Sequence, residues 1–148
     1  MGLFNFKKKD FQELVDEANN LISPIEKGVY VNLSPTIARK SLKLIEKSFK
    51  LSPNNFYGLY TKGVILIQLN QFDEAKTCFD LCNKINKITS NDLISTGDFC
   101  YDISQKLIVA KRINLFQEWF RRAMFCYKLS LEYNPKNVAL LKKINELI

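Results

Sequence analysis

Apolar residues recur at helical spacing along almost the whole chain, and this periodicity limits the folds that the chain can adopt. After Asp10, for example, Phe11, Leu14, Val15 and Ala18 follow the i, i+3, i+4, i+7 pattern of one helix face. No segment shows the alternation of apolar and polar residues that is typical of a half-buried strand. The sequence therefore predicts an all-α protein with about seven helices in antiparallel hairpins.

Prolines divide this pattern into separate helices. Ser34–Pro35 is typical of a helix start, with a capping serine and a proline at the first helical position. Pro53 ends that helix, because a proline disfavours helical backbone at the preceding residue. Ser23–Pro24 is either a kink in one long helix or the start of a second helix. A further turn is expected near residues 114–117, before a helix that ends at Pro135.

Composition excludes several functional classes. The 148 residues are 47% hydrophobic, enough for one domain with a substantial core. The chain contains no histidine, which excludes a Ser-His-Asp triad, a Cys-His pair and histidine-ligated zinc. It also has no glycine-rich phosphate-binding loop. We therefore predict that the protein is not an enzyme and uses no cofactor.

The four cysteines, Cys78, Cys82, Cys100 and Cys126, are expected to pack as small apolar groups. None forms a C-x-x-C motif, and Cys78 and Cys82 alone cannot complete a metal site. No apolar run reaches the roughly 18 residues of a transmembrane helix. Apolar residues precede the N-terminal lysines, which is the reverse of a signal peptide. These features predict a cytoplasmic protein without a transmembrane segment or a metal.

The first residues of the chain have two interpretations. Phe4 and Phe6 precede three lysines, Lys7 to Lys9. This segment is either a frayed start whose aromatic rings cover the first helix, or a weak interfacial anchor with its lysines near acidic lipid headgroups. The sequence leaves both interpretations open.

A repeated pattern accompanies the helices. Residues 49–55 (FKLSPNN) and 131–137 (LEYNPKN) share an apolar first residue, a proline four positions later and an asparagine two positions after that. Between them, small and bulky residues occupy characteristic positions: Gly63, Phe72, Ala75, Phe79 and Cys82. This pattern resembles the tetratricopeptide repeat, a helix–turn–helix unit of about 34 residues.

The resemblance implies one domain of stacked hairpins in a right-handed superhelix. Its divisions are an N-terminal tail and capping helix (1–21), three repeats (22–55, 56–89 and 90–137) and a C-terminal capping helix (138–148). Counting back from Pro135, the third repeat begins its regular register at Ser104 and places Lys111 where a small residue is usual. Residues 90–103 are then a 14-residue insertion. Because 14 helical residues turn about 40° short of four full turns, we expect an unusually long first helix that starts near Asp92.

In the family that the chain resembles, the first helices of successive repeats line a concave groove that binds partners. The resemblance implies a non-catalytic adaptor or scaffold that binds an apolar peptide, a partner helix or a second copy of itself. The residues expected to contact the partner are Tyr57, Tyr60, Val64, Ile67, Gln68, Ile108 and Arg112. Tyr60 and Val64 stand where some members clamp a terminal carboxylate, so no such clamp is expected. Alternatively, the N-terminal helix or the insertion fills the groove, and these residues are core.

The charge distribution suggests a second function. The net charge of +7 is concentrated in the second half of the chain, where Lys111, Arg112, Arg121 and Arg122 lie close in sequence to Trp119. Basic groups beside stacking aromatic residues are typical of RNA-binding surfaces. The alternative prediction is a basic helical module that binds RNA or DNA.

Overall fold

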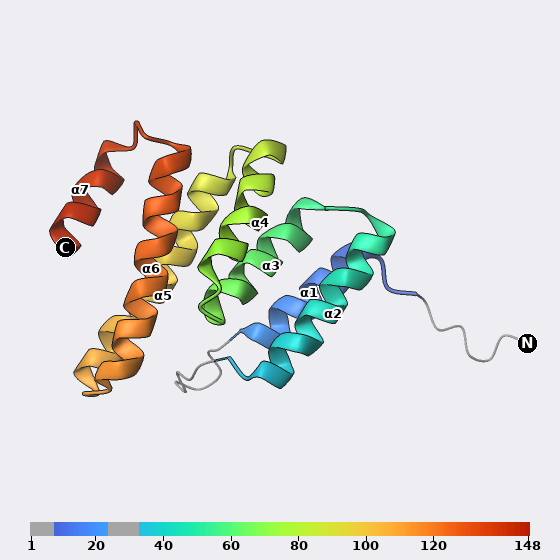
Figure 1. The fold of residues 1–148 in the computed structure, drawn as a ribbon, viewed down its shortest axis with the longest axis horizontal. Coiled ribbons are helices and arrows are strands. Elements are labelled where there is room, and N and C mark those ends of the chain that lie inside the picture. Colours follow the sequence, from blue (N-terminus) through green and yellow to red (C-terminus); the bar gives the residue numbers. More distant parts are fainter. Residues whose placement is uncertain (1–7, 24–32) are drawn as a thin grey trace, which may run out of the picture.

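Three antiparallel helix hairpins and one final helix stack side by side (Figure 1). The computed structural model describes residues 8–23 and 33–148, and these residues contain no strand. The helices are α1 (Phe11–Ile22), α2 (Pro35–Leu51), α3 (Phe56–Gln68), α4 (Phe72–Ile85), α5 (Thr89–Val109), α6 (Ile113–Tyr133) and α7 (Val138–Leu147). The predicted all-α class and its stacked hairpins are confirmed.

Polar side chains cap the N-termini of several of these helices. The Asn55 side chain accepts a hydrogen bond of 2.7 Å from the Gly58 backbone N–H at the start of α3, and Asp10 and Asn137 cap α1 and α7 in the same way. Pro35 is the first residue of α2, as predicted, but the Ser34 hydroxyl makes no capping hydrogen bond. At the start of α2, the prediction was therefore correct for the proline at the first helical position.

A glycine faces an aromatic ring inside two of the hairpins. A methyl group added at Gly63 of α3 would lie 2.5 Å from the Phe79 ring of α4, and one added at Gly97 of α5 would lie 2.7 Å from the Tyr127 ring of α6. Both distances are too short for a real contact, so each hairpin brings its helices together only because the residue is glycine. Gly97 is therefore the third-hairpin counterpart of Gly63, and Lys111 is not.

The third hairpin is longer than the second by one heptad in each helix. Gly97 follows Gly63 by 34 residues, whereas Tyr127 follows Phe79 by 48. Helices α5 and α6 each have 21 residues, compared with 13 in α3 and 14 in α4. Seven of the 14 additional residues lie between Gly97 and the turn at Lys111, and seven lie between that turn and Tyr127; we assign them to 103–109 and 113–119. A heptad turns about 20° short of two full turns, so the apolar face stays in register.

This finding corrects the predicted place of the insertion. The expectation of a long first helix is confirmed, but α5 starts at Thr89, and the extra length is shared between α5 and α6 rather than confined to residues 90–103. The turn lies at residues 110–112, not near 114–117. Figure 1 shows this end of the α5–α6 hairpin extending past the turn between α3 and α4.

The two hairpin turns have the same backbone geometry. Asn70 and Lys111 both have a φ of 60°, and the residues that follow them, Gln71 and Arg112, have φ of −94° and ψ of 70° and 71°. Asparagine tolerates this left-handed conformation better than lysine does. The residue type therefore indicates the turn more clearly at Asn70 than at Lys111.

Helix α1 packs against both α2 and α3. It forms the first hairpin with α2, so it takes the place of a repeat's first helix rather than that of a separate cap. The expected first helix of repeat 22–55 falls largely on residues 24–32, outside the described residues, as does the question of a kink at Pro24. Phe4, Phe6 and Lys7, the core of the proposed interfacial anchor, also lie outside the described residues.

Helix α7 packs on the last hairpin. Its buried Leu140 and Ile144 join one apolar cluster with Leu107 and Trp119 from the added heptads. Lys143 of α7 also forms an ion pair of 2.6 Å with Asp98 of α5. The added heptads therefore enlarge the core that α7 covers.

We predict that Gly63→Ala lowers the free energy of unfolding by roughly 1–3 kcal/mol, because the new methyl group overlaps the Phe79 ring. In a Phe79→Leu background the same change should cost clearly less, since the ring is gone. Urea unfolding of the four proteins in this double-mutant cycle measures the coupling. Equal costs in the two backgrounds would show that the contact does not set the helix spacing.

Candidate functional site

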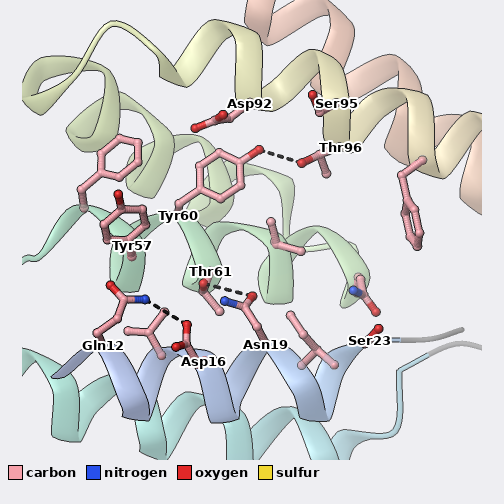
Figure 2. Close-up of a pocket in the computed structure, with 16 residues that line it drawn as sticks. Gln12, Asp16, Asn19, Ser23, Tyr57, Tyr60, Thr61, Asp92, Ser95 and Thr96 are labelled. Carbon is pink, nitrogen blue, oxygen red and sulfur yellow. Dashed lines mark hydrogen bonds between the residues drawn. The ribbon is translucent and has the colours of Figure 1, made fainter. Parts of the chain in front are cut away.

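A pocket of about 630 Å³ opens between α1, α3 and α5 (Figure 2). These are the first helices of the three hairpins. Sixteen residues line the pocket: Gln12, Val15, Asp16, Asn19, Ile22, Ser23, Phe56, Tyr57, Tyr60, Thr61, Val64, Gln68, Asp92, Ser95, Thr96 and Phe99. The pocket thus lies where the sequence predicted a concave groove, with α1 supplying one wall.

Hydrogen bonds join α3 to the helices on both sides. Tyr60 Oη and Thr96 Oγ1 of α5 share a hydrogen bond of 2.6 Å, and Thr61 Oγ1 donates to Asn19 Oδ1 of α1 at 3.2 Å. Figure 2 shows both bonds, one between α3 and α5 and the other between α3 and α1. They hold the three helices at the spacing that leaves the pocket open.

Two tyrosines of α3 have different environments. Tyr60 is partly buried, its ring lies 5.1 Å from that of Phe79, and burial raises the pKa of its phenol above the usual value. Tyr57 is 56% exposed, with its ring edge-on to Phe56 at 5.4 Å. Tyr60 is therefore part of the wall, whereas Tyr57 offers an aromatic surface to a ligand.

Among the described residues, the polar groups that line the pocket include two carboxylates and no basic side chain. Asp16 of α1 accepts a hydrogen bond of 2.9 Å from Gln12 Nε2. The Asp92 carboxylate of α5 accepts no hydrogen bond and forms no ion pair among the described residues, and burial raises the pKa of this carboxyl. The pocket therefore differs in charge from the protein as a whole, which carries +7.

Gln68 is the last residue of α3 and lies beside the pocket. Its side chain is 7% exposed, and its Oε1 is buried without a hydrogen-bond partner among the described residues. A buried amide oxygen without a partner costs free energy, so a donor from a ligand would be favourable there.

Four of the seven predicted contact residues line the pocket: Tyr57, Tyr60, Val64 and Gln68. Ile67 does not, because its side chain is 1% exposed and belongs to the core cluster shared by α3, α4, α5 and α6. Ile108 and Arg112 do not line it either. They were assigned by counting back from Pro135 across the added heptads, and both lie at or beside the 110–112 turn.

The pocket residues of α1 and α5 were missed. Asp92, Thr96 and Phe99 come from α5, and Asp16 and Asn19 from α1. Counting 34 residues forward from α3 would have found the α5 segment, because Gly97 follows Gly63 at that interval. No comparable signal marks α1, since its link to α2 does not have the length of a regular repeat turn.

The alternative nucleic-acid surface is not assembled as predicted. Lys111, Arg112 and Arg121 are exposed, but Arg122 is only 1% exposed and its guanidinium stacks 4.6 Å from the Trp119 ring. Its Nη2 donates to the Gln68 backbone carbonyl at 3.1 Å, at the end of α3. Arg122 is therefore a structural link between the second and third hairpins. Trp119 is buried too, which leaves its ring unable to stack on a base.

The four cysteines are buried and free, as expected for structural residues. Burial raises the pKa of both the Cys82 and the Cys100 thiols to about 12, which keeps them protonated at neutral pH. Within residues 8–23 and 33–148, no cluster of three acidic or cysteine side chains is placed to hold a metal ion. The described helices also include none that is long and apolar enough to cross a membrane.

Comparison with known proteins agrees with this geometry. Residues 57–89 match the tetratricopeptide repeat family, which confirms the resemblance over the α3–α4 hairpin and its link to α5. A comparison with curated proteins gives no match. Residues 57–89 are therefore similar to a tetratricopeptide repeat, and such repeats characterise protein-interaction modules that are generally not enzymes.

We predict that Arg122→Met lowers the free energy of unfolding by roughly 1–3 kcal/mol, because it leaves the Gln68 carbonyl without this donor. Arg121→Met, the neighbouring exposed change, should alter it by less than about 0.5 kcal/mol. Urea unfolding compares the two variants directly. A similar small effect from both would mean that Arg122 does not link the hairpins.

Proposed function

We propose that this protein is a non-catalytic interaction module whose pocket between α1, α3 and α5 binds a segment of a partner protein. The observation that carries this proposal is the exposed ring of Tyr57 at an open pocket, on the first helix of a tetratricopeptide repeat. An aromatic ring that is more than half exposed beside apolar wall residues provides a contact surface for an apolar side chain.

The apolar part of the pocket sets what the partner must bring. Val64, Phe99 and the two tyrosines supply its accessible apolar surface, whereas Val15 and Ile22 also line the pocket but are buried in the core. A peptide or helix that inserts one or two apolar side chains would bury this surface, at about 25 cal/mol per Å² of apolar area. Within residues 8–23 and 33–148, no lysine or arginine lines the pocket, which argues against recognition of a terminal carboxylate.

The test uses Tyr57 because it is exposed, whereas a change at Tyr60 would also remove its bond to Thr96. We expect Tyr57→Ala to weaken partner binding at least tenfold without changing the unfolding midpoint. Ile85→Ala is the matched control, because Ile85 is 55% exposed on α4 and does not line the pocket.

Affinity capture from native lysate with the wild type and these two variants identifies the partner, and titration with the purified partner gives the affinities. The proposal predicts a nuclease-resistant protein partner that Tyr57→Ala loses and Ile85→Ala retains. If nuclease treatment removes the captured material and Tyr57→Ala does not change its capture, the proposal is contradicted. That result would favour nucleic-acid binding by the exposed basic residues.

A further inference from the structure

The pocket presents hydrogen-bond acceptors from two opposite walls. Figure 2 shows Asp16 on α1 and Asp92 on α5, with the aromatic rings of α3 between the two helices. Neither carboxylate forms an ion pair with a described residue. In a chain with 22 basic residues and a charge of +7, this local excess of negative charge is distinctive.

The two carboxylates differ in the hydrogen bonds that they accept. Asp16 receives one hydrogen bond from Gln12. Asp92 receives none from the described residues, and its partial burial removes some of its water. A partly desolvated carboxylate gains more from an incoming cation than a fully hydrated one, because the local dielectric is lower.

Gln68 supplies a third acceptor that is independent of the acidic pair. It lines the same pocket, and its Oε1 is buried without a partner among the described residues. An acceptor of this kind is matched by an N–H donor and not by a carboxylate or a phosphate. The Gln68 oxygen therefore favours a ligand with N–H donors, and the two carboxylates favour positive charge.

The aromatic surface fits the same chemistry. The exposed Tyr57 ring can contact the aliphatic part of a long basic side chain and can also interact with its cation through the ring face. Lysine and arginine combine an apolar stem with a charged donor group, as the pocket combines apolar walls with acceptors.

We infer that the partner segment is a basic–apolar peptide, with a lysine or arginine that enters the pocket between Asp16 and Asp92 beside an apolar side chain on the α3 wall. This inference rests on the proposed function and specifies the chemistry of the ligand. It assigns the charge selectivity of the pocket to Asp16 and Asp92, and the apolar contact to Tyr57 and Val64.

The experiment is a selection of random dodecapeptides displayed on phage against the full-length protein, followed by titration of selected synthetic peptides. We expect the peptides that require Tyr57 to carry a lysine or arginine next to an apolar residue. Replacing that basic residue by norleucine should weaken binding at least tenfold, and the loss should be smaller at high salt.

The protein variants test the two carboxylates. Asp16→Asn and Asp92→Asn preserve side-chain shape, and together they should weaken binding of the basic peptide at least tenfold while leaving the norleucine peptide within about twofold. Asp73→Asn is the matched control, because Asp73 is exposed in the first turn of α4 and does not line the pocket. Unfolding midpoints establish that all variants are folded.

The outcomes separate this inference from the proposed function. Apolar peptides that need Tyr57 but carry no basic residue would overturn the inference and leave the proposed function standing. Basic peptides whose binding ignores Asp16 and Asp92 would overturn it as well. If no selected peptide depends on Tyr57, the proposed function fails together with the inference.

Discussion

The contact between a glycine and an aromatic ring sets the geometry on which the rest of the structure depends. Gly63 allows α3 to approach the Phe79 ring, and Gly97 allows α5 to approach Tyr127. Because the two glycines are 34 residues apart, α3 and α5 present equivalent faces to the groove side. Tyr60 then meets Thr96 of α5 at hydrogen-bonding distance, and the pocket has two fixed walls. A side chain at either glycine would push the helices apart and alter the pocket indirectly.

The third hairpin shows how a repeat can grow without losing this geometry. One added heptad in each helix moves the turn outward by about two helical turns and leaves both apolar faces in register. The added residues enlarge the core through Leu107 and Trp119, against which α7 packs. They also place Ile108 beside the distant turn and Lys111 within it, where neither lines the pocket. The added heptads therefore enlarge the core and displace the turn, but they do not line the groove.

The sequence predicted the fold well where a local signal was strong. The apolar periodicity predicted the helices, and Pro35 predicted the start of α2. The spacing of residues from Gly63 to Cys82 predicted the repeat that the family comparison confirms. It failed where the register depended on distant packing. Counting back from Pro135 misplaced the insertion, because no local feature distinguishes the residues of an inserted heptad from those of a regular helix. The burial of Arg122 was also not predictable, since it depends on a carbonyl in α3 that only the packed hairpins bring close. Nine of the 16 lining residues come from α1 and α5, and a repeat register that misplaces the insertion cannot assemble them.

The most direct test of this account is the urea unfolding of two deletion variants, followed by circular dichroism. One variant lacks residues 103–109 and 113–119, and the other lacks residues 103–109 alone. The account predicts that the double deletion, although less stable, unfolds in one cooperative transition, because each helix loses a whole heptad and the turn is retained. The single deletion should lose cooperativity, since the turn no longer joins helices of matching length. A single deletion that is as stable as the double one would contradict the assigned register, and with it the position of the α5 wall of the pocket.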